Sequence, residues 1–265
     1  MTRRTLRRVC TFSSVRTALP HGVKRVVHGA VFLLAMLPGI ITAQSAGDLA
    51  AWNALVLSPV GAFAPRLSQD QLVDPAHTDM SFRYGRWQYD LDDAIHNDMG
   101  LTIGRQLGAT HTGVSATLAY LSVSCGSCAA WVSGGVEVQR ALFATSRAPD
   151  SAAGLHAGVG LRASAGAARY MGTGGAIASS IAGAATLDLA VPAIWSTQVM
   201  ISLVPGIGFG RFSSPDETAS GVRPMLGGAL GWVLGRGVII GLGVQRIIID
   251  GGPTQAGGSL SWRIP

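Results

Sequence analysis

The stretch Gln255-Ala-Gly-Gly-Ser-Leu-Ser-Trp262, close to the C-terminus, decides the fold class. Leu260 and Trp262 alternate with Ser259 and Ser261, so an apolar side chain recurs at every second position. Successive side chains of a β-strand point to opposite faces, whereas those of a helix return to one face about every 3.6 residues. The stretch is therefore predicted to be a strand with one apolar face and one small or polar face.

The same alternation recurs upstream, from about residue 79 onward. Turn-forming residues separate ten candidate strands: 80–90, 94–106, 110–123, 129–143, 153–165, 178–191, 196–212, 222–234, 238–249 and 254–264. Each of them spans about 10 to 17 residues. Strands of soluble proteins average about five or six residues, whereas strands that cross a membrane need about nine to eleven. Strand length therefore favours a membrane barrel over a soluble sandwich.

The composition agrees with a folded, weakly charged chain. Of the 265 residues, 48% are hydrophobic and only 13% are charged, which excludes a disordered chain. The 36 glycines follow no Gly-X-Y period, which excludes collagen. Many of them stand inside apolar runs, a placement that predicts closely packed strands or tight turns.

The N-terminal residues 1–43 are predicted to be a signal peptide. They hold seven basic residues and no acidic one, and they end in the apolar run Ala30–Ala43, AVFLLAMLPGIITA. A bilayer-spanning helix needs about 20 residues, so this run is short for an anchor. Basic residues, an apolar run and a small residue at the cut are typical of a cleaved secretory leader. An uncleaved anchor is the alternative interpretation.

The leader also explains the basic isoelectric point. After residue 43 the chain has 13 arginines, no lysine and all 14 acidic residues. Nucleic-acid binding requires clustered cations that displace phosphate counterions. We therefore predict no nucleic-acid partner.

Residues 44–78 differ from the rest of the chain. Ser45–Leu57 could form a short capped helix, and Pro59, Pro65 and Pro75 then interrupt the chain. We interpret 44–78 as a lead-in segment, either a short helix or a disordered tail, and we place the barrel at 79–265.

The C-terminal strand carries a resemblance to a known family. Gln255, Gly257, Leu260 and Trp262 form a polar-x-Gly-x-x-apolar-x-aromatic pattern that resembles the terminal strand signal of bacterial outer-membrane β-barrel proteins. The chain departs from that family by continuing through Arg263-Ile-Pro265, where the family usually stops at an aromatic residue. The whole region from about residue 79 looks like a small barrel of this kind.

The resemblance implies an all-β fold, an up-and-down antiparallel transmembrane barrel of eight to ten strands. It implies export through the periplasm and residence in the outer membrane of a Gram-negative-type bacterium. It also implies contact with outer-membrane lipid and insertion by the barrel-assembly machinery. It implies no one activity, because this fold hosts pores, adhesins, anchors and a few enzymes.

Connections of two lengths are predicted. Leu107–Ala109 and Gly235–Gly237 are short turns, whereas Ala168–Ser179 and Arg211–Gly221 are longer loops. Membrane barrels have short periplasmic turns and longer outer loops, so we expect Gly235–Gly237 on the periplasmic side. A helical membrane protein and a soluble β-sandwich or barrel remain as alternative folds.

Cys125 and Cys128 form the one local chemical motif, Cys-Gly-Ser-Cys, between two predicted strands. Thiols of an exported protein reach an oxidising compartment, which favours a hairpin loop closed by a disulfide. A redox-active pair would need a helix start in a βαβ unit, which the sequence does not offer.

Several charged residues fall on the predicted inner face: Glu137, His156, Arg162, Asp188 and Arg263. Side chains just fill the interior of a barrel of about eight strands. A polar network that plugs the lumen is therefore one interpretation, and a polar permeation path is another. The acidic residues Asp90, Asp92, Asp93 and Asp98 are interpreted as a solvated loop. Aromatic residues near predicted strand ends indicate either a girdle or ordinary packing: Trp87, Tyr120, Tyr170, Trp195, Phe209, Trp232 and Trp262.

No catalytic motif, metal-ligand spacing or cofactor-binding motif is recognisable. The sequence therefore predicts a non-enzymatic outer-membrane barrel that serves envelope structure or the passage of small solutes. The alternatives are a barrel hydrolase that acts on envelope lipid and a soluble, lipocalin-like periplasmic binding barrel.

Overall fold

The computed structural model describes residues 77–88, 95–107, 110–123, 129–144, 156–193, 197–234, 237–249 and 252–264. The predicted signal peptide and nearly all of the lead-in segment lie outside these ranges. The described residues form ten strands: β1 (Thr78–Gln88), β2 (Ile95–Gln106), β3 (Thr112–Val123), β4 (Trp131–Ala144), β5 (His156–Tyr170), β6 (Ile177–Pro192), β7 (Gln198–Ser213), β8 (Thr218–Leu234), β9 (Val238–Ile247) and β10 (Thr254–Ile264).

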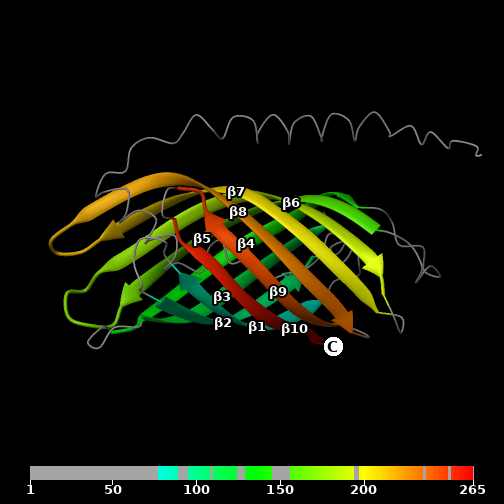
Figure 1. Cartoon of the computed structure of the whole chain (residues 1–265), viewed down its shortest axis with the longest axis horizontal. Coiled ribbons are helices and arrows are strands. Elements are labelled where there is room, and N and C mark those ends of the chain that lie inside the picture. Colours follow the sequence, from blue (N-terminus) through cyan, green and yellow to red (C-terminus); the bar gives the residue numbers. More distant parts are fainter. Residues whose placement is uncertain are drawn as a thin grey trace, which may run out of the picture. The chain divides into compact units, whose positions relative to one another are not determined.

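The ten strands close into one antiparallel barrel (Figure 1). Each strand pairs with its neighbours in the chain, and β1 pairs with β10 to complete the ring. At this closing seam Phe82 lies opposite Leu260, and Gly85 lies opposite Gly257. The predicted all-β, up-and-down barrel is confirmed, and the strand number falls at the upper end of the predicted eight to ten.

The barrel has two rims. Thr78 and Ile264 lie opposite each other in the first and last strands, and we call that end the terminal rim. The opposite end carries the β1–β2, β3–β4, β5–β6, β7–β8 and β9–β10 connections, and we call it the distal rim.

Two loop predictions are wrong. β5 continues to Tyr170 and β6 begins at Ile177, so the predicted loop at Ala168–Ser179 shrinks to residues 171–176. β8 begins at Thr218, and Arg211 and Ser220 pair in register, so the predicted loop at Arg211–Gly221 shrinks to residues 214–217. Small residues such as Ala, Gly and Ser lack the apolar alternation that marks a strand, yet they pair normally once a neighbouring strand is present.

The helical alternative fails at its strongest candidate. Within the uncharged stretch 189–210, residues 189–192 end β6 and residues 198–210 form most of β7. Among the residues that the structure describes, none belongs to a helix long and apolar enough to span a bilayer.

The closing seam depends on a close backbone approach at Gly257. A Cβ atom placed on this residue would overlap the carbonyl oxygen of Tyr84 and lie 2.6 Å from the Cα atom of Gly85. Both neighbours are backbone atoms, so no side-chain rotation can relieve the overlap. Gly257 therefore has a packing role in closure besides its place in the terminal strand pattern.

We predict that Gly257→Val destabilises the barrel by about 1–3 kcal/mol, the usual cost of overpacking. The matched control is Gly104→Ala in β2, because a Cβ atom there would meet its nearest neighbour, the Cβ of Ser115, at 3.6 Å. The measurement is the temperature at which the detergent-solubilised barrel loses its folded gel mobility. Equal melting temperatures for the two variants would contradict a tight seam at Gly257.

Candidate functional site in the lumen of the barrel

A buried ion pair joins two neighbouring strands on the inner wall of the barrel. Arg162 Nη2 on β5 donates to Glu137 Oε2 on β4 over 2.7 Å. The two side chains are 10% and 8% exposed, so most of the pair is shielded from water. A charge-assisted hydrogen bond of this length, with little water near it, holds both side chains in fixed positions. The structure thus brings together two of the five residues predicted to form an inner network.

A second polar cluster spans the closing seam. Arg83 on β1 lies 3.0 Å from Asp98 Oδ2 on β2, measured from Nη2. Gln255 on β10 donates from Nε2 to the same carboxylate oxygen over 3.1 Å. This cluster links three strands, and its Gln255 and Asp98 lie 157 positions apart in the chain. It joins the first and last strands through side chains as well as through the backbone.

Glycines on the neighbouring strands leave space for these long side chains. A Cβ atom on Gly100 would stand 2.7 Å from Arg83 Nε, and one on Gly85 would stand 2.7 Å from Gln255 Nε2. The arginine and glutamine side chains therefore lie across glycine positions of the neighbouring strands. Part of the high glycine content is explained in this way.

At the terminal rim, Arg263 takes part in a third group. Its Nη2 atom lies 3.2 Å from His77 Nε2, and His77 Nε2 lies 3.1 Å from Asp79 Oδ2. Arg263 is on the inner face as predicted, but its partners are His77 and Asp79, at the start of the barrel. Arg263 therefore belongs to a different group from the Glu137–Arg162 pair.

The other two predicted residues occupy β5 and β6. Asp188 lies half-buried on the inner face of β6, in register with Gly158 and Ser202. His156 begins β5 and pairs with Ala190, and its side chain lies outside the described part of the structure. Cys125 and Cys128 also lie outside the described residues, so their disulfide stays a prediction.

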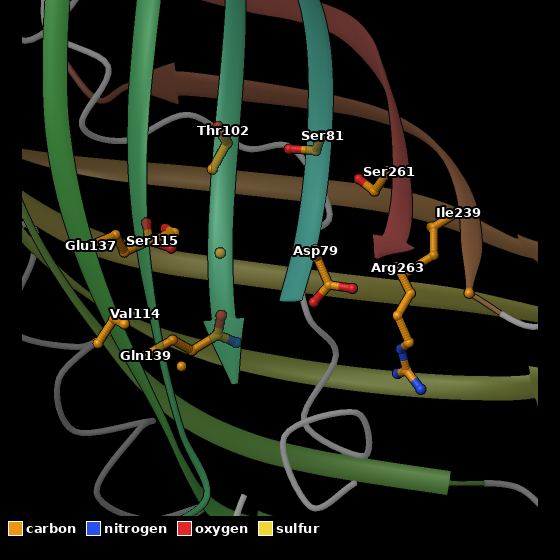
Figure 2. Close-up of a pocket in the computed structure, with 13 residues that line it drawn as sticks. Asp79, Ser81, Thr102, Val114, Ser115, Glu137, Gln139, Ile239, Ser261 and Arg263 are labelled. Carbon is orange, nitrogen blue, oxygen red and sulfur yellow. The ribbon is translucent and has the colours of Figure 1, made fainter. Parts of the chain in front are cut away.

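Two small cavities lie beside these clusters in the described part of the lumen. The first, of about 50 Å³, opens towards the terminal rim; Figure 2 shows Glu137, Ser115, Thr102 and Ser81 among its lining side chains. The second, of about 30 Å³, is lined by Arg162, and Glu137 borders both cavities. A water molecule needs roughly 10–15 Å³, so each cavity has room for only a few.

Apolar side chains fill the lumen towards the distal rim. Trp87 and Trp131 are 3% and 8% exposed, and Leu121 and Ile247 are buried with them. The ring centroid of Trp131 lies 5.2 Å from that of Tyr170 and 6.3 Å from that of Phe212. We call the group formed by Trp87, Trp131, Tyr170 and Phe212 the distal aromatic cluster.

The distal aromatic cluster shows that some of the aromatic residues near strand ends pack inside the lumen and do not belong to a girdle. Trp87 and Tyr170 point inward and pack in the lumen, whereas Tyr120, Phe209 and Trp232 are exposed on the outer face. Trp262 is half-buried in the outward row of β10 that contains Leu260. Trp195 lies outside the described residues.

The prediction that Asp98 lies in a solvated acidic loop is wrong. Asp98 is 5% exposed and faces the lumen from β2. Arg83 was not singled out from the sequence at all. The sequence could have indicated its inward direction, because Arg83 alternates with the outward residues Phe82 and Tyr84, as Asp98 does with Met99. Within the described ranges, no three His, Cys, Asp or Glu side chains gather closely enough to hold a metal ion.

The outer face of the barrel is apolar, and the inner face is polar. Leu118, Ile181 and Leu242 point outward and are 69%, 63% and 62% exposed. Thr117 and Ser180, beside two of them in the chain, point inward and are buried. A soluble protein buries large apolar side chains, so this arrangement suits a surface covered by hydrocarbon. The fold is a closed ten-stranded antiparallel barrel whose outer face is apolar.

Known proteins resemble this barrel in structure but hardly in sequence. The transport unit of the autotransporter AIDA-I from Escherichia coli is 9% identical and has a TM-score of 0.35; the match covers 84% of this chain and 100% of that one. The N-terminal β-barrel domain of OprF from Pseudomonas aeruginosa is 10% identical, with a TM-score of 0.29 and coverages of 71% and 99%.

The attachment invasion locus protein Ail of Yersinia pestis, solved with the heparin analogue sucrose octasulfate, is 11% identical. Its TM-score is 0.29, and the match covers 71% of this chain and 97% of Ail. No protein-family model matches the sequence, and no curated protein matches it.

We predict that Arg162→Ala destabilises the outer-membrane barrel by about 3 kcal/mol, the lower end of the cost of breaking a buried ion pair. The lower end applies because the adjoining cavities can admit water to Glu137. The double variant Glu137→Gln/Arg162→Gln removes both charges and should lose less than the sum of the two single glutamine variants. Urea unfolding in detergent gives the free energy of unfolding of the unaltered protein and of each variant. Additive losses would show that the pair is not coupled.

Proposed function

We propose that the chain is an integral outer-membrane protein with a closed lumen and a structural role in the cell envelope. The apolar outer face supports the location. In β9 the outward residues Val238, Ile240, Leu242 and Val244 are all exposed and apolar. Ten residues that rise about 3.3 Å each and tilt by about 40° cover about 25 Å, the height of the apolar band of such barrels.

The soluble alternative fits this surface poorly. A lipocalin-like barrel in water holds its apolar side chains inside and its polar ones outside. Here the buried inward set includes Gln106, Gln139 and Gln245, while the outward set includes Val136 and Leu230, which are 61% and 48% exposed. Water would have to cover that apolar outer surface, at a high free-energy cost.

The observation that carries the structural role is the filled lumen. Glu137 and Arg162 pair along the inner wall between β4 and β5, Arg83, Asp98 and Gln255 pair along the wall around the seam, and the distal aromatic cluster packs in the lumen towards one rim. Two cavities among the described lumen residues have volumes of about 50 and 30 Å³. A solute larger than a few water molecules therefore needs these contacts to separate before it can pass.

Passage of small solutes is the second candidate, and the shared border of the two cavities favours it. Glu137 lines both, so a polar route leads from the terminal rim past the ion pair. Met225 and Ala182 line the second cavity and also belong to the apolar cluster, so the route ends at apolar side chains. Passage would require these side chains to move.

The biogenesis of the protein follows from the proposed location. Residues 1–43 direct export, and the chain crosses the periplasm before it folds. The terminal pattern of Gln255, Gly257, Leu260 and Trp262 is presented to the barrel-assembly machinery. Outer-membrane lipid then covers the apolar outer face.

We predict that the purified protein gives a flat current trace in a planar bilayer. The double variant Trp87→Ala/Trp131→Ala should show discrete current steps, because it removes the two largest side chains of the distal aromatic cluster. The matched control is Trp232→Ala, since Trp232 faces outward and is 43% exposed. A steady current through the unaltered protein would contradict the closed lumen and favour solute passage.

A further inference from the structure

The strands of the barrel do not all end together at the distal rim. β8 begins at Thr218, which pairs with Ser213 of β7, but β8 pairs with β9 only from Met225 onward. Figure 1 shows the β7–β8 hairpin extending past the end of β9. The first part of β8 therefore has a neighbouring strand on one side only, and we call Thr218–Arg223 the open edge.

One hydrogen bond fixes the direction of the backbone groups along the open edge. The N–H of Ile248 donates to the C=O of Pro224, so the carbonyl of Pro224 points away from β7. The backbone groups of successive strand residues point to opposite sides. Those of Thr218, Ser220 and Val222 therefore point away from β7 as well, and those of the residues between them face β7.

Most of these backbone groups have no partner in the described part of the chain. Thr218, Ser220 and Val222 are exposed, and Arg223 Nη1 donates to the carbonyl oxygen of Val222 over 2.6 Å. No strand or turn of the described residues bonds to the other N–H and C=O groups of these three residues on that side. The chain thus presents donors and acceptors two residues apart, at intervals of about 6.6 Å.

The residues of the open edge do not block further pairing. Proteins commonly protect an edge strand with a proline or with charged side chains. The stretch Thr218-Ala-Ser-Gly-Val222 contains neither, and its small side chains allow a second backbone to approach. The first protective residues are Arg223 and Pro224, directly before the point where β9 begins to pair.

In the proposed membrane location the open edge lies outside the hydrocarbon. β9 presents its exposed apolar outer row from Val238 to Val244, and the open edge begins beyond the distal end of β9. Backbone groups without partners are not stable in hydrocarbon, whereas water can bond to them. The open edge therefore faces water, at the rim opposite the one where β1 begins and β10 ends.

The pattern of donors and acceptors selects the ligand. A row of N–H and C=O groups two residues apart matches the backbone of another extended strand, and antiparallel pairing is slightly more stable than parallel pairing. A second copy in the same membrane does not fit this edge. Two identical antiparallel edges are related by an axis normal to the sheet, which lies in the membrane plane and would invert one of the barrels.

Charges of both signs surround the open edge. Asp216 and Glu217 are exposed in the turn between β7 and β8, and Arg223 stands at the other end of the edge. Arg211 of β7 is exposed on the outer face, and the sequence places Asp250 in the connection between β9 and β10. No single sign of charge is therefore favoured in a ligand, and recognition falls to the backbone.

We propose that the open edge binds an extended, uncharged segment of another polypeptide as an additional antiparallel strand. Thr218 and Ser220 bond to the segment through both N–H and C=O. Val222 bonds through its N–H, while its carbonyl keeps the bond from Arg223. This inference rests on the proposed function for the location of the edge, and it adds a protein-binding surface to the structural role.

The test uses the full barrel in detergent and a fluorescent heptapeptide of alternating threonine and valine. Binding should slow the hydrogen exchange of the Thr218, Ser220 and Val222 amides, measured by NMR, and leave that of Ala219 and Gly221 unchanged. A heptapeptide methylated on every backbone nitrogen cannot donate and should not bind. Methylation of every second nitrogen leaves one side of the peptide intact and should preserve binding.

The matching changes in the barrel concern one position. Ser220→Pro removes a backbone donor from the open side and should weaken peptide binding, measured by fluorescence anisotropy, about tenfold. Its control, Ser220→Ala, keeps the N–H and should bind the peptide as the unaltered barrel does. Unchanged binding by a folded Ser220→Pro barrel would overturn the proposal, and so would binding of the fully methylated peptide.

The barrel without peptide supplies a further check. Slow exchange of the Thr218, Ser220 and Val222 amides in its absence would overturn the proposal, because a second copy or another part of the chain would then cover the edge. Each protein is first checked for folded gel mobility before boiling. A folded barrel that binds no peptide refutes only the open edge as a binding surface, whereas a chain that never folds in detergent refutes the membrane barrel itself. Should Ser220→Pro fail to fold, the methylated peptides still decide the matter with the unaltered barrel.

Discussion

The structure depends on closure of the sheet between β1 and β10. In hydrocarbon no water is present to bond to free backbone N–H and C=O groups, so an open sheet edge would leave several of them unsatisfied at several kcal/mol each. The seam supplies the missing partners over the whole of β1, from Thr78 to Gln88. Gly257 permits the close approach of the two backbones, and Arg83, Asp98 and Gln255 connect the same strands through their side chains.

Once the sheet is closed, its two faces acquire opposite requirements. In the proposed membrane location the outer face meets lipid and needs only apolar atoms, so Leu118 and Leu242 stay largely exposed without cost. The inner face is narrow, and it is filled either by long polar side chains that cross glycine positions or by the aromatic rings around Trp131. Low charge and high glycine content are therefore consequences of one geometry: charges are confined to the lumen and the rims, and glycines make room within it.

The sequence predicted what depends on local alternation and missed what depends on register. Ten strands and the inward placement of Glu137 and Arg162 followed from period two alone, because that period fixes which face a side chain occupies. The contact of Gln255 with Asp98 could not be predicted, since it requires the alignment of strands far apart in the chain. The distal part of β8 was also missed, because its small and polar residues, such as Ser220, form a strand only beside β7.

β9 offers the most direct test of whether the apolar outer face of this barrel points into lipid. Single nitroxide labels would be placed along β9 in the reconstituted protein, and their collision rates with lipid-soluble oxygen would be measured. If the outer face points into lipid, collision rates should be high at Ile240, Leu242 and Val244 and low at Ile239 and Gln245, in strict alternation. Equal rates at neighbouring positions, or maxima at Ile239 and Gln245, would contradict it.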